Sequence, residues 1–452
     1  MVTAVRSTLG PHPDKAPLPD LAGNADWPFL SAYVYPWARF FGRGPAPLQC
    51  PQEGGMELVR EASCGSDERS DAWVSVRPAD AISVHIASKT GPMYEDRIRE
   101  VVEGTLRAMG VTGAEVEVRE QGAYDHVIRA RLLCALKRAG EDGEAFRRPM
   151  PIQVAREGTP KGRLRRSRLY VPGNNARVLA FVDVFGPDCV ILDLEDSVPP
   201  AEKDAARFLV REVLSSMDFG DTEIWVRINP LPRGGREDLE AVLLGRPHGI
   251  CLPKAESPVE VAELAGFLYE LEGRYGIPWL VWIMPIIESP KGVLAAPEIA
   301  KASERVVCLA FGAEDYTAEV GCERSWEALL WARSGIVAAA AAAGIQASDT
   351  VYPDIEDEEG LYEEAKRAKA LGFDGKGAIH PLQIESIHRA FAPTPEELEW
   401  AKGVVAAAEE AERKGHGAVA YRGKMVDRPV VARAKRILET ARAMGMEVGD
   451  AA

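Results

Sequence analysis

Short apolar runs alternate with helical stretches through the second part of the chain. After Arg166 each run rich in Val, Ile and Leu is followed by residues with apolar positions at helical spacing, which is the pattern of repeated βα units. We expect eight strands, at 167–171, 189–194, 223–228, 249–253, 279–287, 306–312, 350–352 and 377–379. Eight parallel strands joined by helices close into a barrel. The pattern therefore predicts an α/β fold with a (β/α)8 TIM barrel over residues 166–400.

A different pattern precedes the barrel. Two alternating stretches that are typical of paired strands come first, then a helix, a third strand and a second helix, at 73–76, 82–86, 96–109, 115–118 and 123–139. This order predicts a small α+β domain, residues 56–140, which we call the front domain. The remaining segments are expected to be an irregular proline-rich leader, a polar linker and a C-terminal helical segment, at 1–55, 141–165 and 401–452.

Composition narrows the classes of partner. With 54 basic and 69 acidic residues the formal net charge is −15, which argues against nucleic acid as a partner. No apolar run reaches the ~18 residues of a membrane span, and no secretory signal precedes residue 20, so we expect a cytoplasmic protein with no membrane partner. The seven scattered cysteines suggest neither disulfides nor zinc, and the basic run at 161–168 is expected to be solvated.

Polar residues follow nearly every predicted strand, and in a barrel these strand ends share one face. Glu288 and Asp315 follow consecutive strands, so their carboxylates should lie together, and carboxylate oxygens suit Mg²⁺. Arg227, at the end of another strand, could hold a substrate carboxylate or an enolate. Taken singly, each acid could equally be a helix N-cap or a first-turn charge. The three residues placed by one topology favour an active site.

Seven short motifs resemble the citrate lyase beta-subunit family of aldolases, in order over about 166–438. They are RSRLYVPGN at 166–174, ILDLEDSV at 191–198, VRIN at 226–229, LPK at 252–254, FGAED at 311–315, AIHP at 378–381 and GKMVDRP at 423–429. The resemblance implies a homotrimeric barrel with Mg²⁺ on Glu288 and Asp315, and with Arg227 on the substrate. It also implies a C-terminal segment that crosses to a neighbouring subunit and brings Asp427 over that neighbour's site. Further substrate-binding candidates are Arg166, Glu195 and Lys254.

The front domain is similar to another family. GAYDHVIRAR at 122–131, with YEDRI at 94–98, resembles the citrate lyase gamma subunit, an acyl carrier. That family has Gly-x-x-Glu-Ser-x-Asp, whose serine carries phosphoribosyl-dephospho-CoA. Here GSDERSD at 65–71 places Arg69 at the serine position, with Ser70 one step later. Either the arm is attached to Ser70 (or Ser66), or the domain has lost it.

The resemblance implies a carbon–carbon lyase that cleaves a 3-hydroxyacyl thioester, citryl thioester to oxaloacetate and acetyl thioester. Asp427 is the candidate for proton transfer, Asp196 a possible support of metal waters, and a citrate lyase alpha-like transferase subunit a possible partner. Three alternatives stay open. One is a lyase or thioesterase acting on free malyl-CoA or citramalyl-CoA, and another is a non-catalytic carrier or assembly subunit. The third is a Schiff-base aldolase that uses Lys254.

Overall fold

The computed structural model describes residues 56–448, apart from 90, 141–143, 148–151 and 414–418. The leader predicted at 1–55 therefore lies outside the described residues. Within the described part of the chain, no helix combines the length and the apolar character needed to cross a bilayer.

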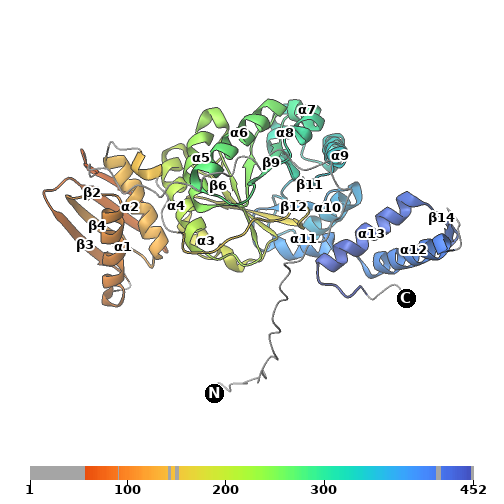
Figure 1. Ribbon diagram of the computed structural model, residues 1–452, viewed down its shortest axis with the longest axis horizontal. Coiled ribbons are helices and arrows are strands. Elements are labelled where there is room, and N and C mark those ends of the chain that lie inside the picture. The colour runs from red at the N-terminus through yellow and green to blue at the C-terminus, as the bar shows by residue number, and fades with distance from the viewer. Residues whose placement is uncertain (1–55, 90, 141–143, 148–151, 414–418, 449–452) are drawn as a thin grey trace, which may run out of the picture. The chain divides into compact units, whose positions relative to one another are not determined.

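Eight parallel strands form a closed barrel in which each strand pairs with its neighbours in sequence, and the last pairs with the first. Figure 1 shows these strands at the centre of the helices that follow them. The strands are β5 (Ser167–Pro172), β6 (Cys189–Asp193), β7 (Glu223–Arg227), β8 (Gly249–Leu252), β9 (Trp282–Ile287), β10 (Cys308–Phe311), β11 (Gln346–Asp349) and β12 (Gly375–Ala378). The predicted α/β barrel is confirmed.

Helices connect successive strands and cover the barrel. They are α3 (Ala176–Leu179), α4 (Lys203–Ser216), α5 (Gly235–Val242), α6 (Pro258–Tyr275), α7 (Pro290–Lys301), α8 (Ala313–Val320), α9 (Trp326–Ala343), α10 (Glu358–Leu371) and α11 (Gln383–Phe391). Several begin with a side-chain cap directly after a strand. In α7, for example, Ser289 accepts a hydrogen bond from Gly292 N immediately after Glu288. Strand ends and helix starts therefore meet at one face.

The seventh strand differs from its prediction. The sequence indicated 350–352, whereas β11 comes earlier and reads Gln-Ala-Ser-Asp, with no apolar alternation. This polar strand is stable in the interior because Asp349, which is 2% exposed, binds Arg333 at 2.8 Å and Lys376 at 2.9 Å. Hydrophobic pattern cannot detect a strand whose burial depends on ion pairs.

The front domain is a four-stranded sheet with two helices. Its elements are β1 (Ala62–Cys64), β2 (Ala72–Arg77), β3 (Ile82–Ser88), α1 (Glu95–Ala108), β4 (Ala114–Glu120) and α2 (Asp125–Ala139), in the sheet order β1-β2-β4-β3. The expectation that β2 and β3 pair is wrong, because β4 lies between them. Helix α1 connects β3 to β4 as a crossover, and a crossover allows these two strands to be parallel.

Helix α2 packs against α4 of the barrel as well as against its own sheet. Eleven of its fifteen residues are buried, including Arg131. Two ion pairs cross this contact, between Arg138 and Asp204 at 2.6 Å and between Arg129 and Glu212 at 3.0 Å. The front domain is therefore joined to the barrel by an apolar surface with charged pairs on it.

The segment between the two domains is also packed. The ring of Phe146 contacts Phe208 of α4 edge to face, with centroids 5.6 Å apart. The prediction of a solvated basic run is wrong for Arg165 and Arg168, each 1% exposed. Arg165 pairs with Glu223 at 2.6 Å inside the amino end of the barrel, where the carboxylate offsets the cost of burying the guanidinium.

The C-terminal segment consists of α12 (Pro395–Arg413), a hairpin of β13 (Val419–Tyr421) and β14 (Lys424–Val426), and α13 (Arg428–Ala443). It has an apolar cluster of its own, distinct from the barrel core. Arg436 of α13 pairs with Asp374 at 2.6 Å. Asp374 directly precedes β12, so this part of α13 lies at the amino end of the barrel.

Candidate active site

A cavity of about 340 Å³ opens at the carboxyl ends of the barrel strands, and we call it the mouth pocket. Its lining brings together Arg227, Glu288 and Asp315, the three residues that the sequence placed at one site. Asp193 and Tyr170 line it as well. The predicted meeting of an arginine and two carboxylates at the strand ends agrees with this geometry.

Glu288 directly follows β9 and is 6% exposed. Its Oε1 accepts a hydrogen bond of 2.6 Å from the backbone N of Lys254. Burial raises the pKa of Glu288 to about 8, and the negative charges of Glu195 and Asp315 contribute in the same direction. A buried carboxyl beside two other acids requires either a proton or a cation. Such a group is suited to binding a metal ion.

Gly312, at the end of β10, makes room for this carboxyl group. A Cβ built on Gly312 would lie 2.6 Å from Glu288 Oε2 and 2.6 Å from Glu288 Cβ, closer than real Cβ contacts. Glycine at this position therefore lets the backbone at the end of β10 approach the Glu288 side chain, which follows the neighbouring strand β9.

Asp315 lies in the first turn of α8, on the strand end adjacent to that of Glu288. Its side chain is 45% exposed, and its nearest cation is Lys254, whose Nζ lies 3.7 Å away. An acid in this position also interacts favourably with the helix dipole, so both interpretations of Asp315 made from the sequence are compatible with its place.

Arg227, at the end of β7, is held by Asp193 of the neighbouring strand. Its Nε and Nη2 each donate to one carboxylate oxygen of Asp193 at 2.6 Å, and Nη1 lies 3.1 Å from Glu195. Burial alone would raise the pKa of Asp193, but Arg227 outweighs it and holds this pKa below its ordinary value. The guanidinium also lies over the ring of Tyr170, 5.3 Å from its centroid. These contacts fix its orientation in the pocket.

Sequence reasoning did not select Asp193 or Tyr170. Both occur inside motifs quoted for the family resemblance, but each also fits the pattern of an ordinary strand residue. A signal was nevertheless present, because an Asp with only apolar neighbours in a buried strand requires a charged partner.

Lys254 follows β8 with φ +52, a left-handed conformation that is uncommon for lysine. Its Nζ lies 2.9 Å from Glu195 and 3.5 Å from Asp196. Burial lowers the pKa of Lys254, but the hydrogen bond and charge of Glu195 outweigh it and raise this pKa above its ordinary value. A Schiff-base nucleophile must be a neutral amine, so this environment disfavours that alternative.

The mouth pocket has the donor atoms for a divalent metal ion. Among the described residues no three His, Cys, Asp or Glu side chains are grouped as a metal site. The mouth therefore offers a pair of carboxylates, Glu288 and Asp315, rather than a closed protein cage. Two oxygen ligands with the other positions left to water and substrate fit Mg²⁺, which retains several waters in such sites.

Asp196 also lines the mouth pocket, whereas four other predicted residues do not. Arg166 differs from its prediction, because it precedes β5 at the amino end of the barrel and pairs there with Asp188 at 2.8 Å. Asp427 caps α13, accepting a hydrogen bond from Val430 N, and does not line the pocket of its own chain. Ser70, in the front domain, is 8% exposed with φ +66, and its backbone N donates to Gln121 O. Ser66 is half-buried, and its hydroxyl donates to Asp71 at 2.8 Å.

Protein-family models match both the barrel and the front domain. Residues 166–381 match the HpcH/HpaI aldolase/citrate lyase family, and residues 59–139 match an acyl-carrier family described as the malonate decarboxylase delta subunit. The second match supports the carrier-like character of the front domain, under a different subunit name from the gamma subunit inferred from its motifs.

Curated relatives and solved structures agree with the first match. The chain is 44% identical over 285 residues to the citrate lyase subunit beta of Leuconostoc mesenteroides, covering 62% of this chain and 94% of that protein. It is 38% identical to the mitochondrial citramalyl-CoA lyase of Mus musculus, covering 61% and 86%. The protein CitE from Mycobacterium tuberculosis, solved with magnesium, acetoacetate and coenzyme A, is 36% identical with a TM-score of 0.52, covering 63% of this chain and 100% of that one.

Proposed function

The chain belongs to the HpcH/HpaI aldolase/citrate lyase family and is a carbon–carbon lyase; from this premise we propose that it cleaves a 3-hydroxyacyl thioester in a Mg²⁺-dependent reaction. The observation that carries the proposal is the mouth pocket, in which Glu288 and Asp315 lie at adjacent strand ends together with Arg227. The substrate that we favour is a citryl thioester, which yields oxaloacetate and an acetyl thioester.

The cleavage is a retro-aldol step. A base removes the proton of the substrate hydroxyl, the bond between the carbinol carbon and the α-carbon of the thioester breaks, and its electrons form the thioester enolate. The carbinol becomes the ketone of the oxo acid, and a proton returned to the enolate carbon completes the acetyl thioester. Glu288 and Asp315 are the residues that would hold magnesium, and the ion would supply Lewis-acid polarisation of the hydroxyl and carboxylate oxygens.

Arg227 has the charge and the fixed orientation to bind an anionic oxygen of the substrate. Its bidentate contact with Asp193 leaves Nη1 facing Glu195 and the pocket. Lys254 adds a second positive charge beside Asp315 and Glu195. These two cations lie among the carboxylates of Asp193, Glu195, Asp196, Glu288 and Asp315, and together with a bound divalent ion they would suit a substrate that carries carboxylate groups and develops an enolate.

The proton acceptor in this proposal is Asp427 from a neighbouring copy of the chain. The ion pair between Arg436 and Asp374 places part of α13 at the amino end of its own barrel, away from the mouth pocket. Asp427 would therefore serve a second subunit, in the homotrimer implied by the family resemblance. A transferase subunit of the citrate lyase alpha type would be a further partner if the acyl group is delivered on a carrier.

Two forms of thioester remain to be distinguished, a free CoA ester and an acyl group on an arm attached to the front domain. Ser70 is only 8% exposed, so its hydroxyl is poorly accessible for attachment of a bulky arm. This burial favours the free CoA ester. An intact-mass measurement on protein from its native host decides this point. An added mass equal to phosphoribosyl-dephospho-CoA supports the arm, and an unmodified mass supports the free ester.

Purified protein assayed with citryl-CoA, citramalyl-CoA and malyl-CoA tests the activity. The lyase reaction releases an oxo acid together with an acyl-CoA, both detectable by coupled dehydrogenase and mass spectrometry. Release of free CoA without an oxo acid would identify a thioesterase instead. No turnover of any of these esters with Mg²⁺ present would favour a carrier or assembly role.

A further inference from the structure

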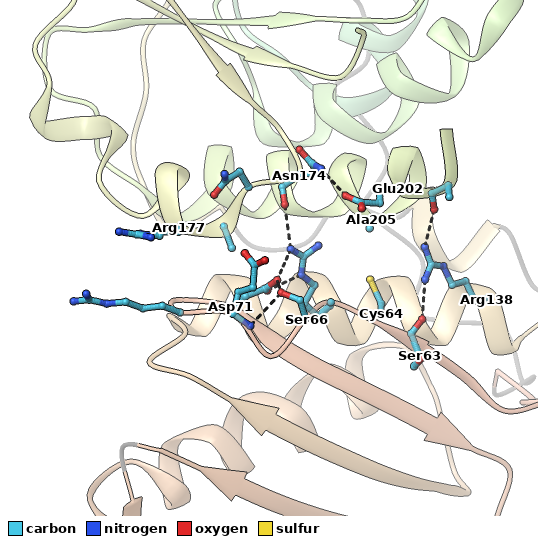
Figure 2. A pocket seen from close by; sticks show the side chains of 16 residues that line it. Ser63, Cys64, Ser66, Asp71, Arg138, Asn174, Arg177, Glu202 and Ala205 are labelled. Atoms are coloured by element: carbon cyan, nitrogen blue, oxygen red, sulfur yellow. Dashed lines mark hydrogen bonds and ion pairs between the residues drawn. The ribbon is translucent and has the colours of Figure 1, made fainter. Parts of the chain in front are cut away.

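A second cavity, of about 390 Å³, lies between the front domain and the barrel (Figure 2). One side is the turn at 65–71 of the front domain, and the other consists of barrel residues 174–177 and 201–205. We call it the interdomain pocket. The lining is mostly polar and includes four arginines, Arg69, Arg131, Arg138 and Arg177.

Two of these arginines are used within the protein. Arg131 binds both carboxylate oxygens of Asp71, at 2.8 and 3.0 Å, and also donates to the carbonyl of Asn174. Arg138 binds Asp204, as described above. The contacts of Arg131 with Asn174 O and of Arg138 with Asp204 join the two sides of the pocket, and the pairs with Asp71 and Asp204 leave little net charge on these two arginines. Figure 2 shows Arg138 with a dashed contact to Ser63 on the front-domain side.

The other two arginines are exposed, and among the described residues neither has an ion pair or hydrogen-bond partner on its side chain. Arg69 comes from the front domain and Arg177 from α3 of the barrel. A planar guanidinium binds phosphate through two parallel hydrogen bonds, so one such group from each side suits a phosphorylated ligand.

The pocket also contains acceptors suited to a sugar. Glu202 lines it from the barrel, with one oxygen accepting from Asn174 Nδ2, and Glu68 lines it from the front domain; Asn175, whose side chain accepts from Val178 N, is exposed at its edge. Carboxylates that accept hydrogen bonds from ribose hydroxyls are a recurring feature of nucleotide sites. Arginines together with carboxylates therefore fit a nucleotide better than they fit a simple anion.

Two segments of the barrel, one at the end of β5 and one after β6, contribute to the lining of both the interdomain pocket and the mouth pocket. Pro172 lines the mouth pocket, and Asn174, two residues later, lines the interdomain pocket. On the next loop, Ser197 lines the mouth pocket and Glu202 the interdomain pocket. A single extended ligand could therefore place one end in each.

We propose that the interdomain pocket binds the nucleotide end of the thioester while its acyl end lies in the mouth pocket, with Arg69 and Arg177 holding the phosphates. The inference rests on the proposed thioester substrate. It assigns a role to Arg69, which occupies the position where carrier sequences have their modified serine. A cation there would hold by ionic contact the kind of group that a carrier holds by a covalent bond. The nucleotide could belong to a free CoA ester or to an attached arm.

Isothermal titration with coenzyme A and with pantetheine, which lacks the nucleotide and its phosphates, tests the site. The variants are Arg69→Ala, Arg177→Ala and the double variant, with Arg107→Ala, an exposed arginine of α1 outside the pocket, as the matched control. Each single variant should weaken coenzyme A binding about five- to tenfold, because each loses one charge-assisted phosphate contact. Pantetheine binding and the control should not change. Coenzyme A binding that is equal in the wild type and the double variant would overturn the proposal.

Kinetics separate this site from the chemistry. In the double variant KM for a hydroxyacyl-CoA should rise while kcat is retained, and KM for the matching pantetheine thioester should be unchanged. If the chain cleaves no thioester but coenzyme A binding still requires Arg69 and Arg177, the proposed function fails and the pocket stands. If cleavage proceeds and the variants match the wild type, the proposed nucleotide site is wrong and the proposed lyase function stands. Titrations use unmodified protein, and an added mass equal to a nucleotide arm in host-derived protein would identify the covalent source.

Discussion

The guanidinium of Arg227 and the carboxylate of Asp193 form a bidentate pair, with both hydrogen bonds at 2.6 Å, between neighbouring strand ends of the barrel. Asp193 is 1% exposed, whereas the side chain of Arg227 keeps 15% of its surface accessible on the pocket side. The pair thus has a buried half that fixes position and an accessible half that can meet a ligand.

Asp193→Asn should therefore reduce catalysis without removing a group that touches the substrate. The amide keeps the size of the side chain but loses the charge that orients Arg227, so we expect kcat/KM to fall about 100-fold. Asp193→Glu, which keeps the charge, should retain more activity than the amide. Steady-state kinetics on the three proteins checks this, and an asparagine variant as active as the wild type would contradict it.

Glu288→Gln and Asp315→Asn should each abolish Mg²⁺-dependent cleavage and leave the fold intact, because each removes an anionic ligand and no core packing. Activity with Mg²⁺ and with EDTA, alongside circular dichroism, provides the measurement. Full activity in EDTA would exclude the metal assignment.

Gly312→Ala should weaken Mg²⁺ binding about tenfold or more. The new Cβ would lie only 2.6 Å from Glu288 Oε2, so the carboxylate would have to move. Gly266→Ala in α6, where a Cβ meets nothing within 4 Å, is the control and should bind Mg²⁺ like the wild type. Calorimetric titration with Mg²⁺ compares the two variants. Equal affinity in both would show that Glu288 does not bind the ion.

Mixing inactive Asp427→Asn with inactive Glu288→Gln should restore part of the activity if Asp427 acts on a neighbouring subunit. A mixed oligomer contains some mouth pockets with an intact Glu288 facing an intact Asp427. The mixture is assayed after subunit exchange has been demonstrated by native mass spectrometry. Exchange without recovery would assign Asp427 to its own subunit or to no site.

Acid unfolding should depend on Glu223 at the amino end of the barrel. Burial alone would raise its pKa, but the hydrogen bonds and charge of Arg165 outweigh it and lower the pKa of Glu223 to about 2. Because the folded-state pKa of Glu223 is lowered, its carboxylate stabilises the fold at pH values above the unfolded pKa of about 4.5. This contribution is lost as the pH falls toward 2. In denaturant titrations, Glu223→Gln should be less stable than the wild type at pH 7, with the gap narrowing below about pH 4.5. A constant gap across this range would contradict the assignment.

The barrel and the central pair of acids were predictable because both follow from periodicity. Apolar strands at regular intervals predict the barrel, and residues directly after those strands share a face, which places Glu288 beside Asp315. Residues whose role depends on a partner far away in sequence were not predictable in this way. Arg165 and Arg168 occur in a run that is typical of solvated charge, yet Arg165 is buried because Glu223, 58 residues later, pairs with it. Neither the φ of +52 at Lys254 nor the contact of its Nζ with Glu195, 59 residues earlier, follows from the local sequence pattern.

Helix α2 has almost no water-facing side, since its sheet covers one flank and α4 covers the other. A carrier domain that moves freely between enzymes needs a polar, solvent-exposed face on each of its helices. Here most of α2 is buried. Separating the chain between residues 140 and 141 would yield two fragments, each with an exposed apolar surface that favours association. Two separately soluble proteins would therefore require several surface residues on both fragments to be hydrophilic instead.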